Sequence, residues 1–455
     1  MIASDETRTE LRAMIRLALP LVAGQVLLFG VNVIDTLLAG HLGPQVLSAV
    51  ALGGQVWMLP LMALQGMMFV VPARVSQLMG AGKRADVGAL FRQILFLAVT
   101  MGVLVLMAIR LAADAVGPLL GVAPDIAEGA AAFLRAIAWA GPPLAVFMAC
   151  RGLSDGLSLT RPAMWFGLLG LLLLIPIGYA LMYGAVGIAP MGAYGSGLAT
   201  ALVIWIQAAL FVGYVATARP YRGIGWGCGR LGPDRPVLAG LLRLGVPMAV
   251  SVTMEVSMFS VAAFAIARFG AVQIAAHQIA LNVAGLAFMV PLGLSGAITV
   301  RVGMALGAGD MVRARLAGLL GITLAACIQT ISCALMVAMP AGIAALYTAD
   351  ADVQGATVSL LAFAALFQFS DAVQVAANGA LRGLQDTRYP AVITLLAYWV
   401  VGMPLGLVLA FAGHMAARGM WVGLLAGLSV AAVLLTWRFM QRTLAAVRHD
   451  VTLDA

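Results

Sequence analysis

The sequence predicts an all-α integral membrane protein with twelve transmembrane helices in two pseudo-symmetric six-helix bundles, and three observations lead to this fold. Hydrophobic residues make up 63% of the 455 residues and charged residues only 10%, whereas soluble domains contain about 45–50% and about 25%. Apolar runs of about 20 residues, the length that crosses a bilayer, recur along the whole chain. The second half of the sequence also repeats the first.

The twelve spans are predicted from the apolar runs. The first run follows a charged stretch, residues 1–12, and no cleavage site follows it, so we expect a retained helix rather than a signal peptide. The predicted spans lie near 13–38, 46–72, 90–112, 130–150, 163–184, 193–215, 238–267, 274–300, 315–338, 355–380, 390–412 and 419–440. A polar stretch rich in Gly, Pro and Arg separates six spans from six. It gives an N-lobe at 1–216, a linker at 217–236 and a C-lobe at 237–455.

The basic residues predict the orientation. The chain has a net charge of +8, with 26 Lys and Arg residues against 18 Asp and Glu. If the N-terminus is cytoplasmic, only four basic residues fall outside: Arg110, Arg135, Arg268 and Arg418. Positive charge concentrates on the cytoplasmic side, so we expect an inner-membrane protein with both termini in the cytoplasm. Because the basic residues lie in short loops between the apolar runs and form no basic stripe with aromatic residues, no nucleic-acid partner is expected.

The repeat is visible in short motifs. The segment from Arg16 to Pro20 recurs as the segment from Arg243 to Pro247, an offset of 227 residues, and Arg151-Gly152-Leu153 recurs as Arg382-Gly383-Leu384 at an offset of 231. Because each copy has six spans, both halves have the same orientation. We expect a pseudo-two-fold axis along the membrane normal and a cavity between the two bundles, an arrangement that is typical of transporters. The alternative is a duplication preserved for packing alone.

Three acidic residues lie inside predicted spans: Asp35 in the first, Glu255 in the seventh and Asp371 in the tenth. A charged side chain at the centre of a bilayer costs about 2.5–3.5 kcal/mol, so such residues usually have a function. None has an arginine three or four residues away in its own helix, so none is a simple intrahelical ion pair. A carboxylate in hydrocarbon either takes up a proton or pairs with a cation such as Na⁺. These acids are the predicted cation-coupling residues.

Polar side chains recur at helical spacing around the acids and in the eighth span. Residues three, four or seven positions apart share one face of a helix, and a face in contact with lipid would not carry such a stripe. We therefore expect these faces to line a cavity that receives substrate. The predicted lining comprises Gln25, Asn32, Ser251, Gln278, Asn282, Phe367, Gln368, Gln374 and Asn378. The alternative for the amides is hydrogen bonding between helices, which is common for Asn and Gln in membranes.

No catalytic chemistry is indicated. The glycine-rich turn at 80–83 lacks the spacing of a Walker motif, so no ATP site is expected. The four cysteines and four histidines show no metal-ligand spacing, and no Ser-His-Asp set can be inferred. We expect neither an enzyme nor a cofactor.

Several segments resemble the multidrug and toxic compound extrusion (MATE) family. They are the segment from Asn32 to Gly43, the segment from Ala276 to Asn282, and the segment from Leu381 to Thr387. Glu255 in the seventh span and Asp371 in the tenth point to the NorM-like branch of that family. The resemblance covers essentially the whole chain.

The resemblance implies a V-shaped exporter of two lobes that expels small organic cations in exchange for inward H⁺ or Na⁺ by alternating access. It implies that Glu255 and Asp371 form a cation site in the C-lobe, where Na⁺ could bind, and that Asp35 belongs to a second site in the N-lobe. We expect a monomer in the lipid bilayer, with no cofactor beyond the coupling ion.

The chain departs from the branch at three positions. The branch often has a tyrosine at the position of Phe367 and asparagines at the positions of Leu174 and Gly178. Na⁺ needs several oxygen ligands, whereas a proton needs only one carboxylate, so the loss of a hydroxyl at residue 367 favours H⁺ over Na⁺.

Other functions are less consistent with the sequence. A flippase for lipid-linked precursors, from the same superfamily, would need basic residues in the cleft to hold pyrophosphate, whereas the charges inside the spans are mostly acidic. An intramembrane enzyme would need a nucleophile or a metal set. A channel would need a symmetric ring of filter residues, and the two halves differ in their acids.

Overall fold

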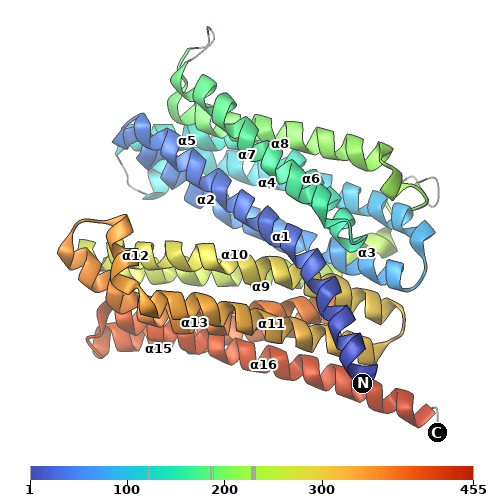
Figure 1. Ribbon diagram of the computed structural model, residues 1–455. Helices are drawn as coiled ribbons and strands as arrows, with labels where there is room; N and C mark the ends of the chain where they lie inside the picture. The colour runs from blue at the N-terminus through green and yellow to red at the C-terminus, as the bar shows by residue number, and fades with distance from the viewer. Residues whose placement is uncertain (1, 121–122, 185–186, 188, 227–231, 454–455) are drawn as a thin grey trace. The chain divides into compact units, whose positions relative to one another are not determined.

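The computed structural model describes residues 2–120, 123–184, 187, 189–226 and 232–453, and the regular structure in these ranges is helical (Figure 1). The first half contains α1 (Ile2–His41), α2 (Pro44–Met68), α3 (Val70–Gly80), η1 (Arg84–Asp86), α4 (Val87–Leu120), α5 (Pro124–Ile137), η2 (Ala138–Ala140), α6 (Gly141–Gly156), α7 (Thr160–Tyr183), α8 (Gly192–Thr217) and η3 (Arg219–Tyr221). The second half contains α9 (Arg235–Ala267), α10 (Ala271–Gly307), α11 (Met311–Ala338), α12 (Pro340–Tyr347), α13 (Ala351–Gly383), α14 (Arg388–Leu395), η4 (Leu396–Gly402), α15 (Met403–Leu407), η5 (Val408–Ala412) and α16 (Ala416–Leu453).

The described residues contain 12 helical stretches long and apolar enough to cross a membrane, which confirms the predicted number. The helices extend beyond the apolar runs. The eighth span, predicted near 274–300, is α10 and runs over 37 residues. A hydropathy pattern finds only the part of a helix that matches the bilayer, whereas backbone hydrogen bonding carries the helix on into polar sequence.

Prolines mark two interruptions of the spans. The second span breaks at Phe69 into α2 and α3, three residues before Pro72, which cannot donate a backbone hydrogen bond to the preceding turn. The eleventh span contains two π-helical segments, η4 and η5, on either side of α15. Pro404 lies at the start of α15 and lacks the same donor. π-Helical turns such as those in η4 and η5 are rare and often occur at functional sites.

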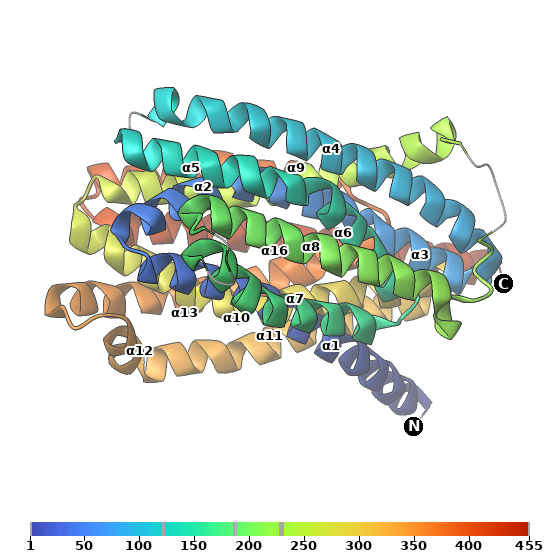
Figure 2. The same ribbon diagram turned by 90° about the horizontal axis from the view of Figure 1, so that it is seen from above.

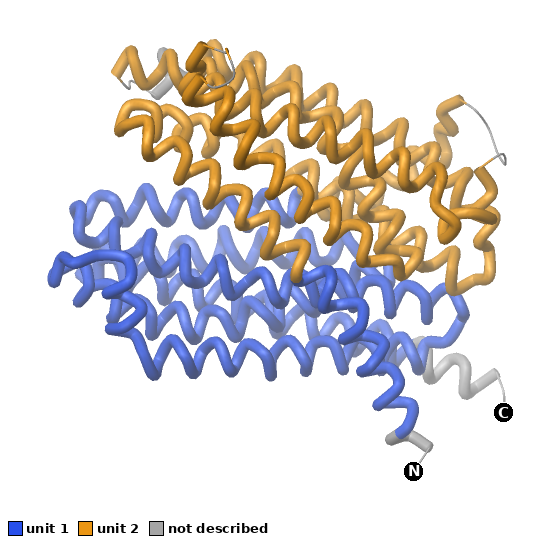
Figure 3. The backbone as a smooth tube through the Cα atoms, turned by 45° about the horizontal axis from the view of Figure 1, so that its top comes forward, with its two compact units in different colours: residues 1–22, 250–455 blue, residues 23–249 orange. Residues whose placement is uncertain are grey.

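The chain forms two compact units, coloured separately in Figure 3. One unit comprises residues 1–22 and 250–455, and the other comprises residues 23–249. The lobes expected from the sequence were divided at the polar linker. The packing instead groups the first part of α1 with the C-terminal half and the first part of α9 with the N-terminal half.

The chain passes from one unit to the other inside two helices, after Val22 in α1 and after Ala249 in α9. These positions are related by the 227-residue offset of the repeat, and each lies two residues after a proline, Pro20 or Pro247. The first part of α1 belongs with the C-terminal half because its apolar residues, including Met14, are buried in one cluster with α10 and α13.

Close packing fixes α13 in its unit. Figures 1 and 2 show α13 beside α10 and α11, and all three belong to the unit of residues 1–22 and 250–455. A Cβ atom on Gly379 would lie 2.6 Å from the carbonyl oxygen of Ser295, so only glycine permits this approach of α13 to α10. The hydroxyl of Thr299 donates to the Gly379 carbonyl at 2.8 Å. These contacts hold the helix that carries Asp371.

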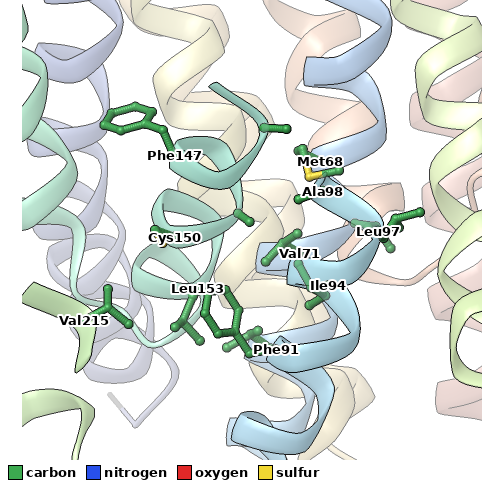
Figure 4. Close-up of a cluster of buried hydrophobic side chains, with 14 of the residues drawn as sticks. Met68, Val71, Phe91, Ile94, Leu97, Ala98, Phe147, Cys150, Leu153 and Val215 are labelled. Carbon is green, nitrogen blue, oxygen red and sulfur yellow. The ribbon is translucent and has the colours of Figure 1, made fainter. Parts of the chain in front are cut away.

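The unit of residues 23–249 has its own apolar core (Figure 4). Phe91 and Ile94 of α4 pack with Val71 of α3 and with Cys150 and Leu153 of α6. The burial of these apolar side chains on several helices holds the unit together.

The described part of the linker is bound to this same unit. The side chains of Arg84, Arg92 and Gln93 donate to linker carbonyls at 2.7 to 3.1 Å. The hydroxyl of Tyr221 lies 2.8 Å from that of Ser154. Burial raises the pKa of Tyr221 to about 12. Residues 217–226 and 232–236 of the linker therefore form a strap that is bound to this unit.

A buried ion pair anchors the start of α1 within the other unit. The Glu10 carboxylate is buried and accepts two hydrogen bonds from Arg301 of α10, at 2.6 and 2.5 Å. Arg313 of α11 donates to the same carboxylate at 3.3 Å. Charge-assisted bonds of this kind are the strongest in proteins, so they fix α1 against α10 and α11.

Candidate functional site

Glu255 on α9 and Asp371 on α13 lie in the same unit, residues 1–22 and 250–455. The side chain of Asp371 is buried, and its Oδ1 accepts no hydrogen bond from the described residues. One turn further on, Gln374 is also buried, and neither atom of its amide has a partner in the described part of the chain. A buried polar group without a partner costs about 1–3 kcal/mol. Three such atoms on one helical turn therefore mark a place for a ligand.

The charges around these atoms come from three residues. Glu255 is half-buried, and its carboxylate interacts electrostatically with that of Asp371 and with the guanidinium of Arg382. Arg382 lies near the end of α13, is buried, and donates to the hydroxyl of Ser295 on α10. With both acids ionised, the two acids and one arginine are one positive charge short of neutrality. A single monovalent cation would balance it.

Arg382 was not among the candidate site residues predicted from the sequence. A search for an arginine within one turn of each acid does not reach Arg382, which stands 11 residues after Asp371. Its presence in the repeated Arg-Gly-Leu motif was the available signal.

Tyr398 was also missed. It lies on η4, its side chain is fully buried, and its hydroxyl has no hydrogen-bond partner among the described residues. It interacts electrostatically with both Glu255 and Asp371. A lone tyrosine in an apolar span carries little signal, because it is usually a packing or interface residue.

Phe367 lies among aromatic rings. It is buried, and its ring centroid lies 5.7 Å from those of Phe259 and Trp421, both in edge-on geometry. This arrangement is typical of aromatic pairs in a core. Phe367 therefore supplies an apolar wall one turn before Asp371.

The buried amide of Gln368 joins helices. It accepts from Gln329 of α11 and donates to the carbonyl of Ala284 on α10 at 3.0 Å. Gln368 therefore forms hydrogen bonds between helices, which is the alternative to lining a cavity that the sequence allows for the amides. Ser251, one turn before Glu255, is buried.

Three further predicted lining residues are more accessible. Gln278 and Asn282 on α10 are exposed, and Asn282 accepts a hydrogen bond from the Tyr347 hydroxyl at 2.9 Å. Asn378 on α13 is half-buried. Their exposure allows contact with a substrate.

The third acid, Asp35, lies in the other unit. It is half-buried and accepts a hydrogen bond from the Ser196 hydroxyl of α8 at 2.6 Å. Gln25 on the same helix is buried, whereas Asn32 is exposed and donates to the backbone of its own helix. The structure therefore brings Glu255 and Asp371 together and places Asp35 in a separate polar group.

The departures at 174 and 178 remove amides from the unit of residues 23–249. Leu174 is buried in an apolar cluster, and a Cβ on Gly178 would lie 2.8 Å from the side chain of Leu38. Ser196 is the polar partner of Asp35 that sequence reasoning missed, because serine is frequent in spans as a small packing residue.

The acids do not form a multi-ligand metal cluster. Among the described residues, no three His, Cys, Asp or Glu side chains gather closely enough to hold a metal ion. Na⁺ at Glu255 and Asp371 would therefore need neutral oxygens as further ligands. The unpaired amide of Gln374 is suited to that role, so the donor set fits such a cation.

Two repeated halves, twelve helices long enough to span a membrane and acids inside those helices define a class, the membrane transporters built from repeats. The comparisons identify the family. The MatE family model matches residues 20–180 and 247–408, and the chain belongs to this family, multidrug and toxic compound extrusion, as the sequence motifs implied.

Relatives and solved structures agree with this assignment. The chain is 42% identical to a probable multidrug resistance protein NorM of Xanthomonas axonopodis pv. citri, over 95% of this chain and 94% of that protein. It is 38% identical to the multidrug resistance protein PmpM of Pseudomonas aeruginosa, over 98% of this chain and 94% of that one. A crystal structure described as MATE in the bent conformation matches with a TM-score of 0.89 and 20% identity, covering 98% of both chains. The fold is therefore that of MATE transporters.

Proposed function

We propose that this chain is a secondary active multidrug efflux transporter that exports small organic cations in exchange for inward H⁺ or Na⁺ by alternating access. The names of its relatives support the export of drugs. The observation that carries the cation exchange is the charge set of Glu255, Asp371 and Arg382.

This charge set gives the exchange its physical basis. With both acids ionised the set lacks one positive charge, and either the driving cation or a cationic substrate supplies it. A second cation would enter a site that is already neutral, so the two compete. Competition for one charge couples the downhill movement of one cation to the uphill movement of the other.

The proposed driving ion is H⁺, with Na⁺ as the alternative. Phe367 places an apolar ring one turn before Asp371, where the NorM-like branch often has a hydroxyl. A proton needs no further oxygen ligand. Asp35, bonded to Ser196, is proposed as a second cation site in the unit of residues 23–249.

The test is ethidium efflux from proteoliposomes with Na⁺ and pH gradients imposed separately. We expect a pH gradient to drive efflux at symmetric Na⁺. Efflux driven by a Na⁺ gradient at symmetric pH, with no response to a pH gradient, would assign the role to Na⁺. If neither gradient drives efflux, the proposed exchange is wrong.

The orientation is proposed from the basic residues. Both termini are placed in the cytoplasm of an inner-membrane monomer, with the loop containing Arg84 inside and the loop containing Arg418 outside. Single cysteines at these two positions, treated with an impermeant thiol reagent on whole cells, test it. We expect labelling at 418 and protection at 84. The reverse pattern would invert the topology.

A lipid-precursor flippase is not proposed. Holding a pyrophosphate would need an excess of basic side chains at the site, whereas two acids here face one arginine.

A further inference from the structure

The hydroxyl of Tyr398 is buried, and no hydrogen bond within the described residues explains its presence. The side chain is 0% exposed, and the hydroxyl has no hydrogen-bond partner among the described residues. Burying a hydroxyl without a partner costs about 1–3 kcal/mol. Phenylalanine would fill the same space without that cost, so the hydroxyl needs a reason outside the packing.

The position of Tyr398 is fixed next to Glu255 by a backbone contact. The neighbouring residue, Trp399, donates its indole N–H to the carbonyl of Met254 at 3.4 Å, and Met254 immediately precedes Glu255. Both tryptophan and tyrosine lie on η4, the π-helical segment of the eleventh span. This contact brings η4 against α9 at the level of the carboxylate.

The buried core around Tyr398 leads to the second acid as well. Tyr398 shares one buried cluster with Met258 and Phe367. Met258 lies three residues after Glu255, and Phe367 lies four residues before Asp371, so each shares a helix face with an acid. The electrostatic interaction of Tyr398 with both carboxylates agrees with this placement.

We infer that the hydroxyl of Tyr398 faces the Glu255 and Asp371 carboxylates and serves as an oxygen ligand of the coupling cation. This inference rests on the proposed cation exchange and names a residue for it. For Na⁺ the hydroxyl oxygen is a direct ligand that helps replace the hydration shell. For H⁺ it is the hydrogen-bond partner of the carboxyl group that holds the proton. In either case η4 supplies the hydroxyl that α13 lacks because residue 367 is phenylalanine.

The test compares Tyr398→Phe with Tyr389→Phe. Tyr389 lies on α14, nine residues earlier, and the Arg438 guanidinium lies 4.5 Å from the centre of its ring, a contact that phenylalanine retains. Thermal unfolding of the purified proteins is followed in Na⁺ or choline at constant ionic strength, and then as a function of pH. Gradient-driven ethidium efflux is measured in parallel.

We expect Tyr398→Phe to be at least as stable as the unmodified protein in choline, because the lost hydroxyl has no partner to leave behind. Its apparent affinity for the driving cation should change about tenfold, the effect of one hydrogen bond to a charged group. That change appears as a tenfold shift in the Na⁺ concentration that stabilises the protein, or as about one unit in the pH of half-maximal efflux. Tyr389→Phe should match the unmodified protein.

A rescue experiment separates a ligand from a packing residue. Adding Phe367→Tyr to Tyr398→Phe returns one hydroxyl to the acids from α13, and we expect the cation dependence to move back toward that of the unmodified protein. A cation dependence of Tyr398→Phe equal to that of Tyr389→Phe would overturn the inference. So would a loss of stability in choline, since it would reveal a structural partner. If the unmodified protein itself responds to neither cation, it is the proposed exchange that fails.

Discussion

The two units carry the same Arg-Gly-Leu motif and use its arginine differently. In the unit of residues 23–249, Arg151 lies 3.7 Å from Asp155, one turn further along the same helix. In the other unit the equivalent Arg382 donates to Ser295 and interacts electrostatically with Glu255.

The aspartates explain the difference. Asp155 corresponds to Asp386 at the 231-residue offset, and Asp386 is held by Arg438 and Arg442 of α16 at 2.9 and 3.3 Å. In one unit, therefore, the aspartate neutralises the arginine of the motif. In the other unit the aspartate is paired with arginines of α16, and the charge of Arg382 acts on Glu255. The same motif in a duplicated scaffold therefore has different partners in the two units.

The largest effect is expected at the two arginines. Removing one partner of a buried ion pair costs about 3–5 kcal/mol, so Arg382→Met and Arg151→Met should both lower the free energy of unfolding. Only Arg382→Met should also abolish gradient-driven efflux, because only Arg382 interacts with one of the proposed coupling acids, Glu255. Thermal unfolding and efflux from proteoliposomes check this. An equal loss of efflux in Arg151→Met, at equal protein in the membrane, would contradict the comparison.

Glu255→Gln tests whether the charges of Glu255 and Arg382 interact. Added to Arg382→Met, it removes the charge left without a partner, and we expect part of the lost stability to return. Additive losses in the double variant would show that the two charges do not interact.

The next effect concerns Glu10, which has no acidic counterpart because the repeat places Val237 at the equivalent position. Glu10→Gln leaves Arg301 without its buried carboxylate and should lower the free energy of unfolding by about 3 kcal/mol. Glu6→Gln, the same change at an exposed position of α1, is the control and should have little effect. Equal melting temperatures for the two variants would show that the ion pair of Glu10 with Arg301 does not stabilise the folded protein.

A smaller effect is expected at Asp35. Ser196→Ala removes its hydrogen bond, which for a charged acceptor is worth about 1.5–3 kcal/mol. Ser260→Ala, which removes a bond to a backbone carbonyl, should cost about 1 kcal/mol or less. Chemical or thermal unfolding compares them, and an equal cost would mean that Asp35 is not ionised in the folded protein.

The smallest effect tests the linker strap. Tyr221→Phe removes the bond to Ser154 and should cost about 1 kcal/mol at neutral pH. Because burial raises the pKa of Tyr221 to about 12, the hydroxyl contributes fully below its unfolded pKa of about 10. The contribution is lost as the pH rises toward 12. Unfolding measured from pH 8 to 12 should show this loss in the unmodified protein and not in Tyr221→Phe. If stability depends on pH in the same way in the unmodified protein and in Tyr221→Phe, the Tyr221 hydroxyl does not help to hold the linker.

The architecture was largely predictable from the sequence. Apolar runs of about 20 residues set the number of spans, because a helix of that length crosses the bilayer and satisfies its own backbone hydrogen bonds, and the repeated motifs set the two halves. The exchange of the first parts of α1 and α9 between the units was not predictable, because hydropathy reports burial in the membrane and not which bundle a helix packs against.

The site was predicted in part for a similar reason. The acids stand out because charge in hydrocarbon is costly, so Asp35, Glu255 and Asp371 could be selected one by one. Arg382 and Tyr398 act on them from a distant turn and from another helix. Such partners depend on packing, which no spacing rule along a single helix reveals.

Competition for one charge is tested most directly by substrate binding. Equilibrium dialysis measures the Kd of labelled tetraphenylphosphonium at increasing H⁺ and Na⁺ in the unmodified protein and in Glu255→Gln, Asp371→Asn and the control Glu6→Gln, whose side chain is exposed. We predict that the Kd rises in proportion to the driving cation in the unmodified protein and in Glu6→Gln, and that the dependence disappears in the other two variants. Substrate binding that ignores both cations, or competition that persists in Glu255→Gln and Asp371→Asn, would contradict the account.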